Sequence, residues 1–136
     1  MSIWKQWIPK EENYYLMTAI STHIDGNSLV LAYIDRDESK RIWIRFESGF
    51  LFMRTTEEGS FEIASEKVQI IKADLELEKR KNWPLFIVSD SQLVYDFKKD
   101  YRITNKEPIG HYIIISYDDI TEILSSSPPK VLSEDL

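Results

Sequence analysis

The chain has 136 residues, of which 43% are hydrophobic and 12% aromatic, so it can bury a sizeable core. A single domain over residues 1–136 is the usual arrangement at this length. There is no cysteine, which excludes disulfides, thiolate metal sites and cysteine nucleophiles. The formal net charge of −6 argues against direct binding of nucleic acid, because phosphate contacts need clustered Lys and Arg.

Targeting signals are also missing from the sequence. Residues Met1 to Trp7 lack a basic segment followed by an apolar run, which is the pattern of a secretory signal. Nowhere does the chain approach the roughly 18 consecutive apolar residues of a membrane span. We therefore expect a cytoplasmic protein that makes no membrane contact.

The first half of the chain has the pattern of antiparallel strands. Ile42, Ile44 and Phe46 alternate with polar residues, which places them on one face of a strand. Turn residues separate the segments, with Asp25-Gly26-Asn27 as the clearest hairpin signal. The predicted strands are 14–22, 28–34, 41–47 and 50–55. We expect them to form a four-stranded meander over residues 14–56.

The second half begins with a stretch, residues 65–82, whose pattern fits neither a strand nor a helix consistently. A short buried strand is predicted at Leu85 to Val88. Ser89 and Gln92 have the spacing of a capping box, so a helix is expected from about Ser91 to Lys99. Its apolar positions, Leu93, Val94 and Phe97, follow helical spacing.

Two further segments and a tail complete the chain. A strand is predicted at 111–117, followed by a short element at 120–124. The tail is expected to pack at Val131 and to fray after Leu132. This order of elements predicts an α+β single domain, with an antiparallel β meander followed by a strand–helix–strand unit.

The sequence offers little that resembles catalytic or metal chemistry. Its two histidines, His23 and His111, lie far apart and have no two-histidine metal spacing. No nucleophile-elbow motif is present, and the glycines never cluster into a phosphate-binding loop. A partnership of Ser91 with His111 is the one nucleophile and base combination that the sequence leaves open. We predict no catalytic, cofactor or metal site.

Acidic residues are the stronger candidates for a functional surface. Carboxylates on loops or on an exposed helix face attract a basic protein partner. The candidates lie at the ends of predicted strands and on the predicted helix. The predicted partner-binding residues are Glu57, Glu58, Asp96, Asp100, Asp118 and Asp119.

Several short motifs resemble a known class of proteins. The motifs are Trp83-Pro84-Leu85-Phe86, Ser89-Asp90-Ser91-Gln92-Leu93, His111-Tyr112, and Asp118-Asp119-Ile120 before Pro128-Pro129. In this order they resemble small immunity proteins of bacterial polymorphic-toxin and contact-dependent growth inhibition systems. The chain departs from that pattern at Asp90, where an Asn is expected, and near Asp100, where a Ser-x-Gly is missing.

The resemblance implies a function by binding. An immunity protein neutralises a cognate toxin domain, such as a nuclease, by occluding its active or substrate-binding site, and it has no catalytic residues to transfer. The alternative is a non-catalytic protein–protein interaction or regulatory module with an unrelated partner. An enzyme of another type is a third hypothesis, for which the sequence contains no motif.

Overall fold

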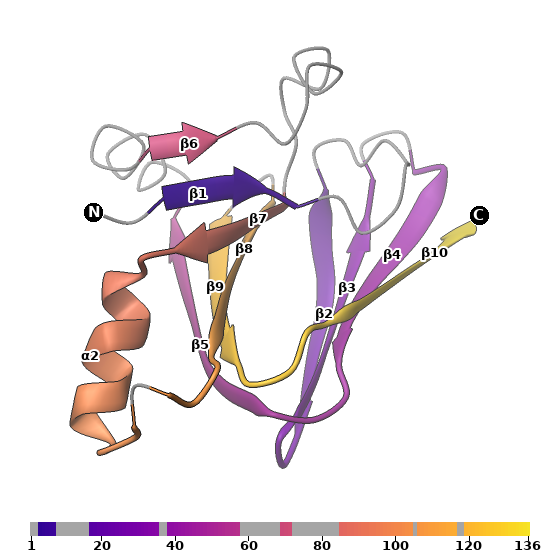
Figure 1. Cartoon of the computed structure of the whole chain (residues 1–136). Coiled ribbons are helices and arrows are strands. Elements are labelled where there is room, and N and C mark those ends of the chain that lie inside the picture. The colour runs from indigo at the N-terminus through magenta and orange to yellow at the C-terminus, as the bar shows by residue number, and fades with distance from the viewer. Residues whose placement is uncertain are drawn as a thin grey trace.

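The computed structural model describes residues 3–7, 17–35, 38–57, 69–71, 85–104, 106–116 and 119–136. Within these ranges the chain forms two β-sheets and one helix (Figure 1). Strands predicted at 28–34, 41–47, 85–88 and 111–117 are formed, with bounds that shift by a residue or two. The short element predicted at 120–124 is a strand. That helix is nine residues long, too short to cross a bilayer.

One sheet has four strands in the order β10-β4-β3-β2. β2 (Thr18–Asp25), β3 (Ser28–Ile34) and β4 (Lys40–Phe46) form an antiparallel meander. Gly26, with a φ of 60°, makes the tight turn between β2 and β3. β10 (Lys130–Asp135) pairs with β4 along its whole length. The expectation that the tail frays after Leu132 is therefore wrong.

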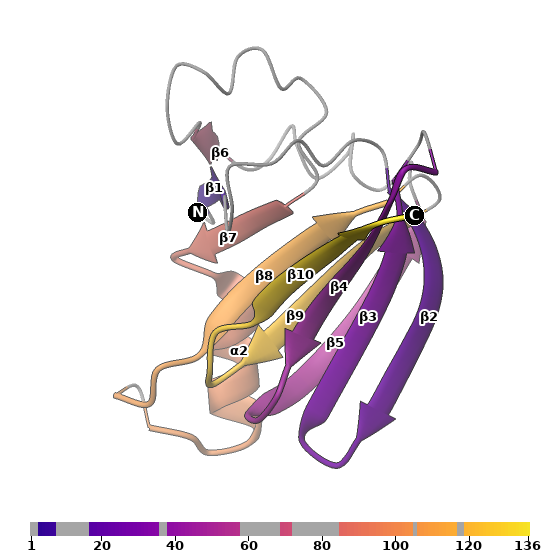
Figure 2. The same cartoon turned by 90° about the vertical axis from the view of Figure 1, so that its right-hand side faces the viewer.

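The other sheet has six strands in the order β5-β9-β8-β7-β1-β6. Its strands are β1 (Ile3–Gln6), β5 (Phe50–Glu57), β6 (Gln69–Ile71), β7 (Leu85–Ser89), β8 (Gly110–Ile115) and β9 (Asp119–Ser125). Neighbouring strands are antiparallel, except that β1 and β6 are parallel. Figure 2 shows this sheet behind β10, β4, β3 and β2.

The predicted α+β class is wrong, because the molecule is β-rich and its short helix joins neighbouring strands of a large sheet. The predicted four-stranded meander is also wrong, since β5 leaves it after Gly49 and pairs with β9. The free edge of β4 is taken instead by β10, from the far end of the chain. Local alternation identifies strands, but their pairing over long sequence distances is decided by how the two sheets bury each other.

The main core lies between the sheets. Its fully buried side chains come from both inner faces and include Leu29, Ile42, Ile44, Phe46, Leu85, Ile114 and Ile123. A second apolar cluster covers the outer face of the six-stranded sheet, with Trp4, Phe86, Val88, Ile113 and Ile120. The six-stranded sheet is therefore buried on two sides, and polar groups on its outer face need partners.

The helix α2 (Gln92–Asp100) begins one residue later than predicted. Its cap is Ser91, whose Oγ accepts a hydrogen bond from Val94 N at 3.1 Å, and the predicted capping box at Ser89 is wrong. Ser89 is the last residue of β7, and Asp90, with a φ of 50°, turns the chain into the helix. No residue of α2 is buried, so the helix lies on the sheet without entering the main core.

Candidate partner-binding site

Asp96 and Asp100, two of the predicted partner-binding residues, lie one turn apart on α2 and are exposed. The amide of Gln92 donates a hydrogen bond to Asp96 Oδ1 at 2.9 Å, which orients that carboxylate on the surface. Tyr95 and Tyr101 are also exposed, at 57% and 67%. α2 and its C-cap Tyr101 therefore present carboxylates and aromatic rings together, beside the basic residues Lys98 and Lys99 of the last turn.

Asp119 has a different environment at the start of β9. It is half-buried, and its Oδ1 accepts a hydrogen bond of 2.7 Å from the hydroxyl of Ser116, which closes the turn between β8 and β9. Burial and then the Asp119 charge raise the pKa of the core residue Tyr33, so this carboxylate lies near the main core. Asp119 therefore has a structural task at the turn.

The remaining acidic candidates are only partly described. The register of β5 and β9 pairs Glu57 with Asp119. Glu58 and Asp118 lie outside the described residues. The cap of α2 contacts the beginning of β8, where Ser91 is hydrogen-bonded to His111. Asp119 lies near the opposite end of β8, beside Ser116. Asp96 and Asp100 thus do not share a face with Asp119, and among these three residues the α2 pair is the one that is exposed.

A pocket of about 490 Å³ opens beside the first turns of α2. Its wall includes hydroxyl, amide and charged groups, with Asp90 and Lys98 as the charged members. Tyr95 and Ile109 add apolar surface. A pocket with this mixed lining suits one long polar side chain of a partner protein better than an apolar ligand.

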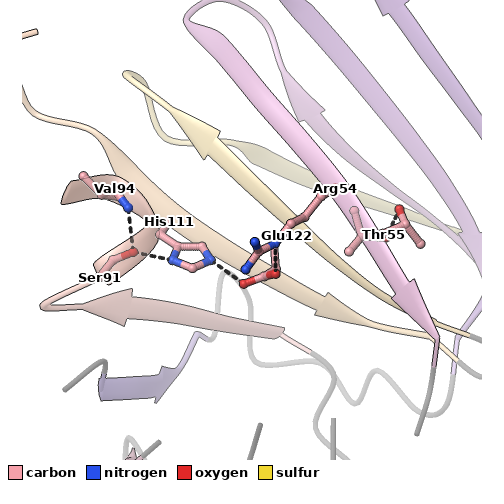
Figure 3. Close-up of polar contacts among 7 residues, drawn as sticks. Arg54, Thr55, Ser91, Val94, His111 and Glu122 are labelled. Atoms are coloured by element: carbon pink, nitrogen blue, oxygen red, sulfur yellow. Dashed lines mark hydrogen bonds and ion pairs between the residues drawn. The ribbon is translucent and has the colours of Figure 1, made fainter. Parts of the chain in front are cut away.

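A chain of hydrogen bonds joins α2 to the outer face of the six-stranded sheet (Figure 3). Ser91 Oγ lies 2.7 Å from His111 Nδ1, and His111 Nε2 lies 3.0 Å from Glu122 Oε1. Arg54 Nε donates to Glu122 Oε2 at 2.5 Å. These four residues, which we call the Ser91–Arg54 network, come from the helix cap, β8, β9 and β5.

The sheet register explains why these side chains meet. Arg54 is directly opposite Glu122, and His111 is opposite Leu124, two residues further along β9. His111 and Glu122 are therefore diagonal neighbours on the same face. Sequence reasoning considered Ser91 with His111 and missed Glu122 and Arg54. The available signal was an acidic residue next to the apolar residues Ile123 and Leu124 of a short predicted element.

Glu122 is the residue of this network whose ionisation is favoured by its neighbours. Burial alone would raise the pKa of Glu122, but hydrogen bonds and electrostatic attraction from His111 and Arg54 outweigh it, so the pKa is lowered. An ionised carboxylate only accepts hydrogen bonds, so His111 Nε2 is the donor to Glu122. The other ring nitrogen, Nδ1, shares a hydrogen bond with the Ser91 hydroxyl, so each group in the network has a partner.

Serine, histidine and carboxylate in this order resemble the nucleophile, base and orienting acid of a hydrolase. Two features favour a structural role instead. Ser91 Oγ already accepts the helix amide of Val94, and His111 is only 4% exposed. The imidazole ring is thus enclosed by the protein, where it cannot pass a proton to the leaving group of a substrate that binds from solvent. Among the described residues, no three His, Cys, Asp or Glu side chains form a metal site.

The chain was also compared with known proteins. No protein-family model, curated protein or solved structure matches it. Function is therefore argued from the geometry of α2, its pocket and the Ser91–Arg54 network.

Proposed function

We propose that this chain is an immunity protein, which binds a basic toxin domain in the cytoplasm and neutralises it by covering the toxin's active or substrate-binding site. The observation that carries the proposal is α2, an exposed helix with Tyr95, Asp96, Asp100 and Tyr101 on its surface. None of its residues is needed to fill the main core. A helix of this kind is free to serve as a contact surface.

The attachment of α2 supports a role in tight binding. Its cap is tied to β8, β9 and β5 by the Ser91–Arg54 network, and Phe97 packs against Phe52 with ring centroids 6.1 Å apart. A contact surface that is already ordered loses less conformational entropy when a partner binds. The buried polar groups therefore fix the orientation of the exposed ones.

The exposed groups fit a basic partner. Carboxylates form strong charge-assisted hydrogen bonds with Lys and Arg, and tyrosine rings bind the same cations through their faces. Asp96 and Asp100 thereby stand in for the phosphates that a nuclease toxin would bind. The net charge of −6 accelerates the encounter with a positively charged domain. Inhibition by occlusion requires no catalytic residue, cofactor or metal.

The test is rescue of growth from the toxin. The chain is co-expressed with the C-terminal domain of a large secreted protein encoded by a neighbouring gene. Wild type should restore growth, and the double variant Asp96→Lys, Asp100→Lys should fail while remaining folded. Glu134→Lys with Asp135→Lys is the matched control, because it makes the same change in charge on exposed residues of β10. Absence of both rescue and binding for wild type would exclude the immunity function.

The alternative, a regulatory module with an unrelated partner, is separated by the same experiment. If the chain is such a module, wild type neither binds nor neutralises the toxin domain. Wild type would instead capture another protein from an extract of the native host, and the Asp96→Lys, Asp100→Lys variant would not capture it. The hypothesis that Ser91 is the nucleophile of a hydrolase is tested with a serine-reactive fluorophosphonate probe. We expect no labelling at Ser91.

A further inference from the structure

The edge strand β2 is the most exposed regular element of the four-stranded sheet. It pairs with β3 on one side and is the last described strand of its sheet (Figure 2). All eight of its residues are exposed, including Ile24 at 50%. An edge strand presents unpaired backbone N–H and C=O groups, which are a template for another strand.

The segment Ser21 to Ile24 of β2 lacks the charged residues and proline that usually protect an edge. Charged residues and proline on an edge strand prevent unwanted pairing. The opposite edge of the sheet, β10, contains Lys130, Glu134 and Asp135. From Thr18 to Ile24, β2 contains no Lys, Arg, Asp, Glu or Pro. A β-bulge at Ile20 distorts the first half of the strand, whereas Ser21 to Asp25 pairs regularly with β3.

We propose that Ser21 to Asp25 binds the same segment of a second copy of this chain. The two segments pair antiparallel about a two-fold axis at His23, so that Thr22 of one copy lies opposite Ile24 of the other. Such an arrangement is self-complementary, as an isologous dimer interface must be. It joins two four-stranded sheets into one continuous sheet.

The chemistry of the edge favours a second copy over a basic partner. Residues 18–24 offer a basic protein no carboxylate, whereas α2 does. Each copy has a net charge of −6, so two copies repel each other least where the surface is uncharged. No two carboxylates meet at this interface, because Asp25 lies opposite Ser21 of the other copy.

Packing gives a further reason for the pairing. Ile24 and Thr22 are the cross-strand partners of Leu29 and Leu31, both of which are buried in the main core. The half-exposed Ile24 therefore lies at the margin of the apolar layer. Ile24 of a second copy would extend that layer and remove apolar surface from water on both copies.

The interface leaves the proposed toxin-binding helix accessible. α2 flanks the six-stranded sheet at the left of Figure 1, whereas β2 belongs to the other sheet, and the two elements are also apart in Figure 2. The dimer can consequently form without the toxin, and its test does not depend on the immunity function.

The first experiment measures the mass of the full-length chain by light scattering or sedimentation, from low micromolar to several hundred micromolar. Wild type should reach twice the chain mass. Ile24→Lys should remain at the chain mass, whereas the control Leu132→Lys, exposed at 41% on β10, should dimerise like wild type. A wild type that is monomeric at every concentration, or equal effects of the two variants, would overturn the proposal.

The second experiment tests the two-fold axis. Because the chain has no cysteine, His23→Cys introduces a single thiol. Directly opposed residues of an antiparallel pair have Cα atoms about 4.5–5.5 Å apart, which is within disulfide range. His23→Cys should form a disulfide-linked dimer at least tenfold faster than Leu132→Cys under the same oxidant. Equal rates for the two variants would contradict the pairing.

Discussion

α2 and β2 both lie at the surface, yet they differ in what holds them and in what they present. α2 is anchored through a buried polar network and displays carboxylates and tyrosines. β2 is held by backbone pairing with β3 and is almost uncharged. Exposure alone therefore does not identify a binding surface. The charge of the element, and the way it is fixed, indicate which partner it suits.

The largest expected effect comes from the core that supports both regions. Phe46 is fully buried, and its ring packs edge-on against Tyr112 with centroids 5.5 Å apart. Phe46→Ala should lower the free energy of unfolding by about 3–5 kcal/mol, through lost burial and a cavity. Urea denaturation measures this, with Phe46→Leu as the milder control. A loss below about 1 kcal/mol would mean that the two sheets are not packed as described.

Removing a side chain of the Ser91–Arg54 network should affect α2 and leave β2 unchanged. His111→Leu retains much of the side-chain volume but leaves Ser91 and Glu122 without their shared partner. We expect a loss of about 2–3 kcal/mol, since a buried carboxylate loses a hydrogen bond. Hydrogen exchange should accelerate in α2 and stay unchanged in β2. Equal acceleration in both elements would contradict a local role for the network.

The Ser91–Arg54 network should also weaken in acid. The pKa of Glu122 is lowered from its ordinary value of 4.5 in the folded protein, so its contribution to stability is present above that pH. It is lost as the pH falls below 4.5 through the folded value. The stability difference between wild type and Glu122→Gln should therefore shrink from pH 6 towards pH 3. A difference that is constant with pH would show that Glu122 is not ionised in this network.

The smallest effect distinguishes two neighbouring serines. Ser91→Ala should cost about 1 kcal/mol, because Ser91 caps α2, whereas Ser89→Ala should change stability by less than about 0.5 kcal/mol. Thermal unfolding measures both. The reverse order would restore the capping box that the sequence predicted at Ser89.

The elements of this fold could be read from the sequence better than their partners could. β3 and β4 follow local apolar patterns, and the hairpin of β2 and β3 follows the turn chemistry of Asp25-Gly26-Asn27, so these elements were predicted. The pairing of β4 with β10 joins Arg45 to Lys130, and no local pattern contains that information. The class was wrong because a short helix and several strands do not reveal how many strands share a sheet.

In the candidate site, too, local features could be predicted from the sequence, whereas contacts between distant residues could not. The exposure of Asp96 and Asp100 follows from helical spacing, which indicates the outward face of the helix. The hydrogen bond between Asp119 and Ser116 could not be predicted, since it depends on the geometry of a turn. Arg54 and Glu122, 68 positions apart, meet only through the register of β5 and β9. Long-range register is the information that a single sequence lacks.

The central claim is that the acidic and aromatic face of α2 binds a basic toxin domain. Titration calorimetry with the C-terminal domain of the neighbouring secreted protein, at increasing salt, tests it most directly. Wild type should bind with an affinity that falls as salt rises, because charges are screened beyond about 8 Å at physiological ionic strength. Asp96→Lys with Asp100→Lys should weaken binding at least tenfold, and Glu134→Lys with Asp135→Lys should have little effect. Binding that is insensitive to both salt and the α2 variant would contradict the account.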